Sequence, residues 1–320
     1  MKKVVYILFL STLISFSQTE KDNYNVVAKE FMKNYNDSNF SAIFTMFDSN
    51  MQTALPQTKT TEFLKTLKEK RGNIKEMMFN ELKRTAHVYK TTFNEGVRNI
   101  LFSLDANNKI NGLYISAYIP KNLPKLERNS TEMILPFNEE WTVFWGGTNV
   151  YENYHVAYNN QKYAYDLVIT KDGQSFKNDR SKNENFYVFG KEIIAPSKAT
   201  VVKVITGVSD NVPGILNPKD VTGNTVILET ENKEFILFAH FKEKSITVKE
   251  GQKVNQGDVL GLCGNSGNSS EPHLHLSLQN VKDMEIATGA KLLFNKIKVN
   301  GKIQTDYLPI KNDKIQNLKL

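Results

Sequence analysis

The spacing of apolar residues changes at Gly72, and this change divides the first part of the chain into helices followed by strands. Before Gly72, apolar residues recur at helical intervals in three segments: 26–35, 40–47 and 63–67. The pair Leu55-Pro56 breaks the helical pattern before the third segment. After Gly72, the pattern becomes strand-like in four segments: 77–82, 87–93, 97–104 and 110–119. The turn at 105–108 predicts a hairpin from the last two segments. Residues 21–119 are therefore expected to form an α+β domain, with helices first and an antiparallel sheet after them.

From residue 136 onward, the chain has the pattern of short strands separated by Gly, Asn and Pro turns. The expected strands are 143–145, 164–169, 193–194, 200–205, 225–229, 234–241 and 274–278. No long helical pattern interrupts them, so we expect an all-β domain of barrel-sandwich or antiparallel-sheet type over residues 136–281. The prolines and charges of residues 120–135 predict a linker, and residues 282–320 are expected to form a C-terminal extension.

Residues 1–18 have the pattern of a secretory signal peptide. Lys2 and Lys3 precede an apolar run that is shorter than the about 20 residues of a membrane-spanning helix, which argues against a retained anchor. Cleavage is expected near Ser17 or Gln18, and no cysteine follows the run to carry a lipid. We therefore expect an exported protein, in the periplasm, the cell envelope or the medium, with no membrane span after cleavage.

Composition narrows the range of partners. The formal charge is +7, or +5 without Lys2 and Lys3, and this modest basic excess favours anionic polymers such as cell-wall material. The basic residues form no stripe interleaved with aromatic residues, which argues against nucleic acid. Cys263 is the only cysteine, so no internal disulfide forms, and its apolar neighbours indicate a buried structural residue. Nothing in these patterns specifies an oligomeric state.

Histidines carry the candidate chemistry, because three of the five lie close together in the second half of the chain. His273 and His275 lie on one predicted strand and share one face, while the leucines that alternate with them face the core. His240 lies at the end of an earlier strand, and His155 and Asp166 lie upstream. A catalytic zinc takes three protein ligands and leaves one position for water, so five candidates are two too many. Two of the histidines should therefore serve the chemistry and not the metal.

These residues lie in motifs that closely resemble the lysostaphin/LytM-type zinc metallopeptidases, which are peptidoglycan endopeptidases. In chain order the motifs are Asn153-Tyr-His155, Tyr163-Ala-Tyr-Asp166, Ile194-Ala-Pro196, Phe238-Ala-His240-Phe241, Val254-Asn-Gln-Gly-Asp-Val-Leu-Gly261, Gly264-Asn-Ser-Gly267 and Pro272-His-Leu-His275. The resemblance covers residues 136–281. By position in these motifs, it implies one Zn²⁺ with His155, Asp166 and His275 as metal ligands, and it implies that His240 and His273 are the catalytic residues.

Two positions depart from the family pattern. Ten residues separate His155 from Asp166, whereas the family commonly has a much shorter spacing, so a loop over 156–162 must bring the two ligands together. A related subset with the pattern Asn-x-His followed by Gln-x-Tyr-Ala-x-Asp fits this longer spacing. Phe238 replaces a tyrosine that is often found two residues before the first catalytic histidine, and this replacement would remove a hydroxyl from the site.

Several polar or aromatic neighbours leave two interpretations open. Tyr154, Tyr163 and Tyr165 fit either the wall of a substrate groove or the core, and alternating aromatics on a strand favour the core. Asn153 fits a turn, or a residue that contacts a metal ligand, better than a catalytic role.

Residues 21–119 resemble the cone-shaped, cystatin-like domains related to nuclear transport factor 2. The resemblance depends on Lys29-Glu-Phe31 and on Asn39-Phe-Ser-Ala-Ile-Phe44. Such domains are often non-catalytic accessories beside enzymes. His87 lies in a predicted strand without a second candidate ligand nearby, so we expect a structural role for it.

Together, the resemblances imply an exported zinc metalloendopeptidase that hydrolyses amide bonds in peptidoglycan stem or cross-bridge peptides by zinc-activated water. The alternative is a catalytically silent member of the fold that binds and activates a partner cell-wall hydrolase. Such members typically lack metal or catalytic residues, and none is missing from this sequence.

Overall fold

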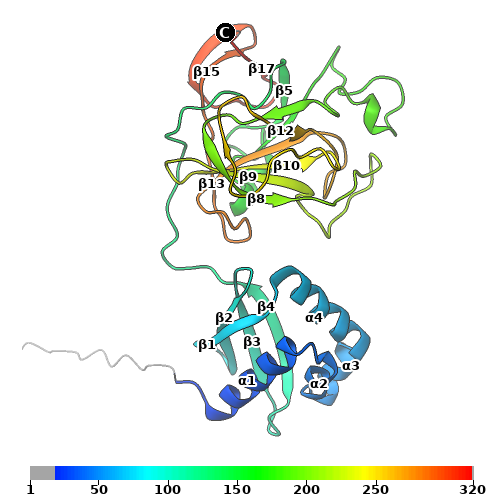
Figure 1. The fold of residues 1–320 in the computed structure, drawn as a ribbon, viewed down its shortest axis with the longest axis vertical. Coiled ribbons are helices and arrows are strands. Elements are labelled where there is room, and N and C mark those ends of the chain that lie inside the picture. The colour runs from blue at the N-terminus through cyan, green and yellow to red at the C-terminus, as the bar shows by residue number, and fades with distance from the viewer. Residues whose placement is uncertain (1–18, 319–320) are drawn as a thin grey trace, which may run out of the picture. The chain divides into compact units, whose positions relative to one another are not determined.

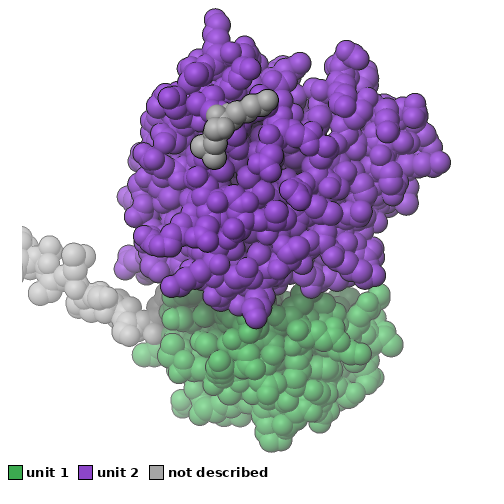
Figure 2. Space-filling model, turned by 45° about the horizontal axis from the view of Figure 1, so that its top comes forward, with its two compact units in different colours: residues 1–119 green, residues 120–320 purple. Residues whose placement is uncertain are grey.

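The computed structural model describes residues 19–318 and divides the chain into two compact units, residues 1–119 and 120–320 (Figures 1 and 2). Each unit has its own hydrophobic core. The expected signal peptide over residues 1–18 lies outside the described residues. Among residues 19–318, no helix is long and apolar enough to cross a membrane.

The first unit consists of helices followed by an antiparallel sheet, which confirms the predicted α+β class. Its elements are α1 (Asp22–Asn36), α2 (Phe40–Thr45), α3 (Ser49–Ala54), α4 (Gln57–Arg71), β1 (Ile74–Lys83), β2 (Ala86–Phe93), β3 (Val97–Leu104) and β4 (Ile110–Ala117). The sheet order is β1-β2-β3-β4, and each neighbouring pair is antiparallel. The β3–β4 pair is the predicted hairpin, with its turn at residues 105–108.

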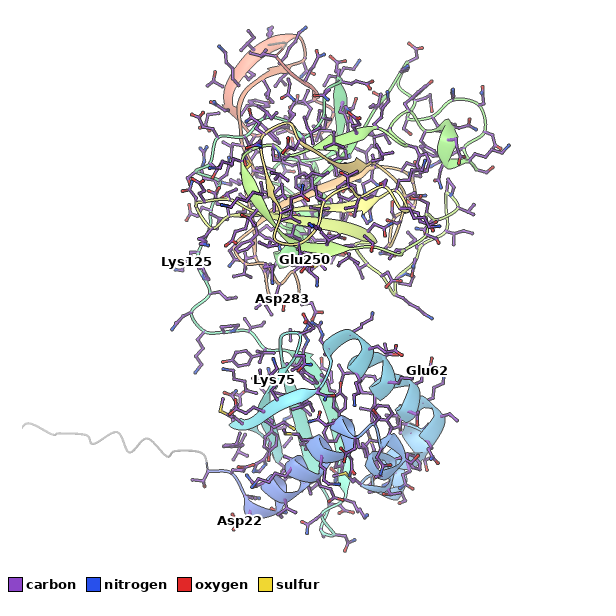
Figure 3. The ribbon with its side chains drawn as sticks, in the orientation of Figure 1. Asp22, Glu62, Lys75, Lys125, Glu250 and Asp283 are labelled. Atoms are coloured by element: carbon purple, nitrogen blue, oxygen red, sulfur yellow. The ribbon has the colours of Figure 1, made fainter. Side chains whose placement is uncertain are left out.

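Local sequence signals begin and end the helices of the first unit. Asp22 lies in the first turn of α1 (Figure 3), where a carboxylate interacts favourably with the helix dipole. The side chains of Asn39 and Asp48 accept backbone N–H groups of α2 and α3, at 3.2 Å and 2.7 Å. Pro56 precedes α4, and Gly72 follows it with a φ of +71°, which glycine adopts without steric cost. The apolar spacing predicts segments within α1 and α4 and one that covers α2, but it does not predict α3.

The core of the first unit forms where α1 packs on the sheet. The ring of Phe31 lies 5.1 Å from that of Phe102, and Tyr35 lies 5.8 Å from Phe93, both measured between ring centroids. His87 is also part of this interior, because its ring stacks on Tyr24 at 3.6 Å. This packing agrees with the structural role expected for His87.

The second unit is all-β apart from short 3₁₀ helices, as predicted. Its elements are β5 (Trp141–Trp145), η1 (Tyr154–Ala157), η2 (Asn159–Gln161), β6 (Tyr165–Val168), η3 (Asn183–Asn185), β7 (Glu192–Ile194), β8 (Ala199–Ile205), β9 (Asn224–Glu229), β10 (Phe235–Phe241), β11 (Lys253–Val254), β12 (Val259–Leu262), β13 (Leu274–Gln279), β14 (Gly289–Ala290), β15 (Phe294–Val299), β16 (Lys302–Tyr307) and β17 (Lys314–Asn317).

One large antiparallel sheet organises the second unit. Its strand order is β11-β8-β9-β10-β13-β6-β5-β17-β15-β16, and β14 pairs with β13 outside this path. A separate two-stranded sheet pairs β12 with β7. Strand β13 lies inside the large sheet, between β10 and β6, so its backbone is fixed by hydrogen bonds on both sides. This strand carries His275, and His273 immediately precedes it.

The expected linker over residues 120–135 is partly wrong, because its second half belongs to the second unit. Met133 and Leu135 are buried in the core of that unit, and the backbone N–H of Ile134 donates to Pro196. The Asn129 side chain also donates to the backbone carbonyl of Leu293 at 2.9 Å. Prolines and charges surround these apolar residues, and for this reason the sequence pattern predicts a linker.

Residues 282–320 are not an appended extension, because their strands complete the large sheet. Strand β17 pairs with β5, and β15 pairs with both β16 and β17. Phe294, Ile297 and Ile315 are buried in the same core as the rest of the unit. The boundary expected at residue 281 therefore has no structural counterpart.

Candidate metal centre

Strand β13 places His275 directly opposite Asp166. In the paired register, Asp166 on β6 faces His275 from one side and Ala239 on β10 faces it from the other. Leu274 and Leu276 are buried in the core, so His275 lies on the opposite face of the strand, as predicted. A strand that is hydrogen-bonded on both sides therefore holds two of the expected ligands next to each other.

The carboxylate of Asp166 is the point where three imidazoles meet. Its Oδ1 atom lies 3.0 Å from His275 Nδ1, 3.5 Å from His155 Nε2 and 3.5 Å from His273 Nε2. Asp166 is only 6% exposed. A buried carboxylate is stable only when it is paired or bound to a metal ion, and here its three neighbours are ring nitrogens.

His155 enters the cluster from the loop between β5 and β6, at the start of η1. The residue is 0% exposed, and its Nδ1 atom lies 2.8 Å from the side-chain oxygen of Asn153. Its Nε2 atom is buried and has no hydrogen-bond partner within residues 19–318. Such an orphaned atom is costly in a protein interior unless something binds it. The orphaned nitrogen points to a ligand between His155 and Asp166.

His155, Asp166 and His275 fit a metal ion by distance and by donor type. One ligand atom from each residue lies within 4.8 Å of the others. Tetrahedral zinc with ligand bonds of about 2.0–2.1 Å places its ligand atoms about 3.3 Å apart, close to the 3.0 Å and 3.5 Å separations from Asp166 Oδ1. Two imidazoles and one carboxylate form a donor set that catalytic zinc sites use. The residues present therefore fit a zinc ion with a fourth position left open.

His240 approaches the cluster from a distorted end of β10. Its φ is +65°, in the left-handed region that residues other than glycine rarely adopt, and the β9–β10 register shifts at this point. The distortion is held by the backbone, because His240 N–H donates to Thr222 and its carbonyl accepts from Gly264. Backbone strain of this kind concentrates at functional sites. The ring lies 4.8 Å from that of His273.

Backbone carbonyls determine which nitrogen is free on each of the two remaining histidines. The Nδ1 atom of His240 lies 2.8 Å from the Ser266 carbonyl, and the Nδ1 atom of His273 lies 2.8 Å from the Glu271 carbonyl. A carbonyl only accepts, so each Nδ1 carries a proton and donates. In the neutral rings, the Nε2 atoms therefore keep their lone pairs. Both rings are prepared to accept a proton at Nε2.

The electrostatics of the cluster favour a neutral His155 and an ionised Asp166. Burial opposes ionisation of Asp166, but the imidazoles of His273, His275 and His155 outweigh it and hold the carboxyl pKa well below its usual range. Burial lowers the pKa of His155 to about 4, despite the opposing attraction of Asp166. Burial and the neighbouring imidazoles also hold the pKa of His240 well below its ordinary value. At neutral pH, His155 is thus uncharged and Asp166 is ionised, as metal binding requires.

The pKa of His273 is shifted in the opposite direction to the pKa values of His155 and His240. Burial acts to lower its pKa, but the Asp166 carboxylate outweighs burial and raises it. Its side chain is 18% exposed, whereas those of His155 and Asp166 are 0% and 9% exposed. His273 is therefore more exposed to solvent than His155 or Asp166.

The five predicted site residues lie together in the structure. The neighbouring aromatic residues, in contrast, differ in their burial. Tyr165 is buried in the core, whereas Tyr154 is partly exposed and its ring lies 4.0 Å from that of His155. Tyr163 is half-buried and adopts a φ of +67°. Phe238 is fully buried in the core, so the interpretation that it replaces a hydroxyl at the site is wrong. A tyrosine hydroxyl at position 238 would lie in the core.

Sequence reasoning missed the groups that orient the histidines. Two of them, the carbonyls of Ser266 and Glu271, belong to the backbone and have no residue-type signature. The left-handed turn at His240 was also missed. The one available signal was the glycine pair on the neighbouring loops, because a Cβ on Gly223 or Gly267 would lie within 2.4 Å of the other loop's backbone.

Two protein-family models match the chain, one in each unit. Residues 185–287 match peptidase family M23, and residues 28–113 match a protein family of unknown function, DUF3887. The first match includes His240, His273 and His275. The other two residues of the cluster, His155 and Asp166, lie before it, so their placement comes from the structure.

Known proteins match short segments of the chain. A peptidoglycan DD-endopeptidase, ShyA of Vibrio cholerae, is 41% identical over 56 residues, which are 18% of this chain and 13% of that protein. Endolysin 2638A of Staphylococcus phage 2638A is 38% identical over 60 residues, which are 18% of this chain and 12% of that protein. The matched segments therefore span a small part of either relative.

Among solved structures, the catalytic domain of lysostaphin from Staphylococcus simulans is 22% identical. The alignment covers 37% of this chain and 87% of that domain, with a TM-score of 0.24. The DUF3887 match locates the first unit in a family, and its cystatin-like resemblance stays a prediction. The chain therefore carries a peptidase family M23 domain, preceded by an N-terminal DUF3887 domain.

Proposed function

We propose that the second unit is a zinc metalloendopeptidase that hydrolyses amide bonds in peptidoglycan stem or cross-bridge peptides. The observation that carries this proposal is the arrangement of the buried cluster. Asp166 Oδ1 lies within 3.5 Å of nitrogen atoms from three histidines, and the ring of His240 lies 4.8 Å from that of His273. Three residues fit the metal, and two imidazoles remain for proton transfer.

The metal ligands in this proposal are His155, Asp166 and His275. Their nitrogen and oxygen donors suit zinc better than magnesium or calcium, which prefer oxygen ligands. When bound, zinc would polarise a carbonyl and lower the pKa of a water molecule to about 7. The chain's contribution is to hold the three donors at a buried site and to keep the His155 imidazole neutral.

The proposed roles of His240 and His273 follow from their free nitrogens. Each Nδ1 is engaged with a backbone carbonyl, so each Nε2 is available to accept a proton from the attacking water or to donate to the developing oxyanion. The low pKa of His240 keeps its ring neutral and ready to accept a proton. His273 is more open, which suits contact with the peptide carbonyl. Two oriented imidazoles beside one metal thus provide both proton transfer and charge stabilisation.

The completeness of the cluster argues against the silent alternative. A fold member that only activates a partner hydrolase has no need of metal ligands, yet all three are buried and within 4.8 Å of one another. His240 also adopts a costly backbone conformation that a scaffold would not require. The geometry therefore favours turnover.

The substrate and the site of action are inferred from the family and from the relatives. The matches include a protein named as a peptidoglycan DD-endopeptidase. A peptidoglycan substrate requires the domain to act in the cell envelope, in agreement with the export expected from residues 1–18.

The test is digestion of purified peptidoglycan by the full chain, with the products identified by mass spectrometry. We expect new amino groups and fragments cleaved within peptides, with activity lost on chelation and restored by zinc. The His273→Ala variant should release no such fragments. His87→Gln is the matched control, because it removes the one histidine outside the cluster. Intact peptidoglycan after incubation with a zinc-loaded, folded wild type would contradict the proposal.

A further inference from the structure

Asn153 is a buried residue that uses its whole side-chain amide beside the proposed metal centre. The residue is 0% exposed. Its Nδ2 atom donates to the carbonyls of Gly147 at 3.1 Å and Ala164 at 2.9 Å. Its Oδ1 atom accepts the backbone N–H of His155 at 3.2 Å and lies 2.8 Å from His155 Nδ1. Four contacts from one amide connect three separate points of the loop.

The chemistry of these partners determines the orientation of the amide. Gly147 and Ala164 present carbonyl oxygens, which only accept hydrogen bonds, so the NH₂ group must face them. The backbone N–H of His155 only donates, so the oxygen must face His155. A flipped amide would lose all of these hydrogen bonds. The two carbonyls and the backbone N–H therefore establish that the Asn153 side-chain oxygen, and not its nitrogen, lies beside the His155 ring.

This orientation determines the tautomer of His155. Because an amide oxygen lies 2.8 Å from Nδ1, the neutral ring carries its proton on Nδ1. The lone pair is then on Nε2, which lies 3.5 Å from Asp166 Oδ1 and has no hydrogen-bond partner among the described residues. The other tautomer would direct an N–H toward the metal position and would leave two acceptors facing each other at Asn153.

Asn153 also joins the two ends of the long loop between the ligands. Its oxygen holds His155, where the loop begins, and its NH₂ group holds the carbonyl of Ala164, two residues before Asp166. Gly147, two residues after the end of β5, accepts a hydrogen bond from the same amide. Ten residues separate the two ligands in sequence, and one side chain fixes the distance between the ends of this segment.

We propose that Asn153 is a positioning residue for the metal centre: it selects the Nδ1–H tautomer of His155 and closes the loop that brings His155 to Asp166. The inference concerns the metal site of the proposed function and adds a residue to it. Asn153 does not touch the metal or the substrate in this proposal. Hydrogen bonds of this kind to a metal-binding histidine typically change metal affinity by about 10–100-fold.

The test uses the full chain and two readouts, neither of which is activity. Long-range ¹H–¹⁵N spectra of the metal-free protein with labelled histidine identify the nitrogen that carries the proton in His155. Competition with a chromogenic chelator gives the zinc affinity. Asn153→Leu removes every contact at similar volume, and Asn153→Asp keeps the acceptor but removes the donors. Asn160→Leu is the matched control, because Asn160 lies in the same loop and its amide donates to the backbone carbonyl of Met284 and, among residues 19–318, forms a hydrogen bond with neither His155 nor Asp166.

We expect the Nδ1–H tautomer in the wild type, in Asn160→Leu and in Asn153→Asp, and its loss in Asn153→Leu. Zinc affinity should fall about 10–100-fold in Asn153→Leu and less in Asn153→Asp. The inference is overturned if Asn153→Leu keeps both the tautomer and the wild-type affinity, or if Asn153→Asp behaves as Asn153→Leu in both readouts. If Asn153→Leu does not fold, Asn153→Asp decides: the retained tautomer with reduced zinc affinity supports the inference, and loss of the tautomer or wild-type zinc affinity overturns it. A wild type that binds no zinc would refute the proposed function, and the tautomer spectra would still judge the role of Asn153.

Discussion

His155 should make the second unit sensitive to acid when no metal is bound. Burial lowers its pKa from 6.5 to about 4 in the folded protein. As the pH falls through this interval, the unfolded chain binds a proton at His155 and the folded protein does not. The stability that depends on a neutral His155 is therefore present above pH 6.5 and is lost between pH 6.5 and 4. Replacing His155 by Gln, which does not titrate, should remove this loss.

The size of the effect follows from the shift. Each tenfold change in proton affinity is worth about 1.4 kcal/mol, so a pKa that falls from 6.5 to about 4 corresponds to about 3 kcal/mol. The side chain is 0% exposed, so solvent screens this interaction little. Asp166 contributes mainly below this interval, because its folded pKa lies well below its usual value. His240 and His273 are present in both proteins and do not account for a difference between them.

Tryptophan fluorescence isolates the second unit in this experiment. The chain has two tryptophans, Trp141 and Trp145, and both lie on β5. Urea unfolding of the metal-free wild type and of His155→Gln, each at pH 7 and pH 4 in the presence of a chelator, gives the free energy of unfolding of this unit. The wild type should lose about 3 kcal/mol more than the variant between the two pH values.

Equal losses in the two proteins would refute this reasoning. Such a result would mean that His155 is solvated, or already protonated, in the folded metal-free protein. A larger loss of unfolding free energy in His155→Gln than in the wild type would also refute it, because the predicted difference has the opposite sign.

Three further predictions test other parts of the account. His240→Ala should keep zinc but lose roughly 100-fold or more in peptidoglycan hydrolysis, because proton transfer is impaired and the ligands remain; unchanged turnover would exclude it from the mechanism. Phe238→Tyr should lower the free energy of unfolding in urea by about 1–3 kcal/mol and leave turnover unchanged, because the new hydroxyl is buried in the core. A gain in turnover would place position 238 at the site. Ile297→Ala should destabilise the second unit by about 2–5 kcal/mol, as measured by tryptophan fluorescence, because Ile297 is fully buried; no change would separate residues 282–320 from this unit.

The candidate site was accessible from the sequence because its signals are local. Alternation along β13 correctly divided His275 from Leu274 and Leu276, since successive strand residues point to opposite faces. The order of the motifs then predicted that residues far apart in sequence form one metal site. The structure places two of them, Asp166 and His275, opposite each other.

Long-range pairing was not accessible in the same way. Strand β17 pairs with β5, which lies far away in sequence, and nothing in residues 282–320 indicates that partner. Periodicity also overestimated the buried face of α1, where Val26 was grouped with Val27 but is 63% exposed. Neighbouring helical residues point about 100° apart, so both do not face the same core. The left-handed conformation of His240 arises from contacts with two other loops, and the residue type does not favour it.

The central claim is that His155, Asp166 and His275 together hold one zinc ion. Its most direct test is the zinc content of the purified full chain by mass spectrometry of the metal, for the wild type and for His275→Ala, after exposure to limiting zinc and removal of excess. The account predicts one zinc per wild-type chain and none in a folded His275→Ala variant. A wild type without zinc, or a variant that retains a full equivalent, would contradict it.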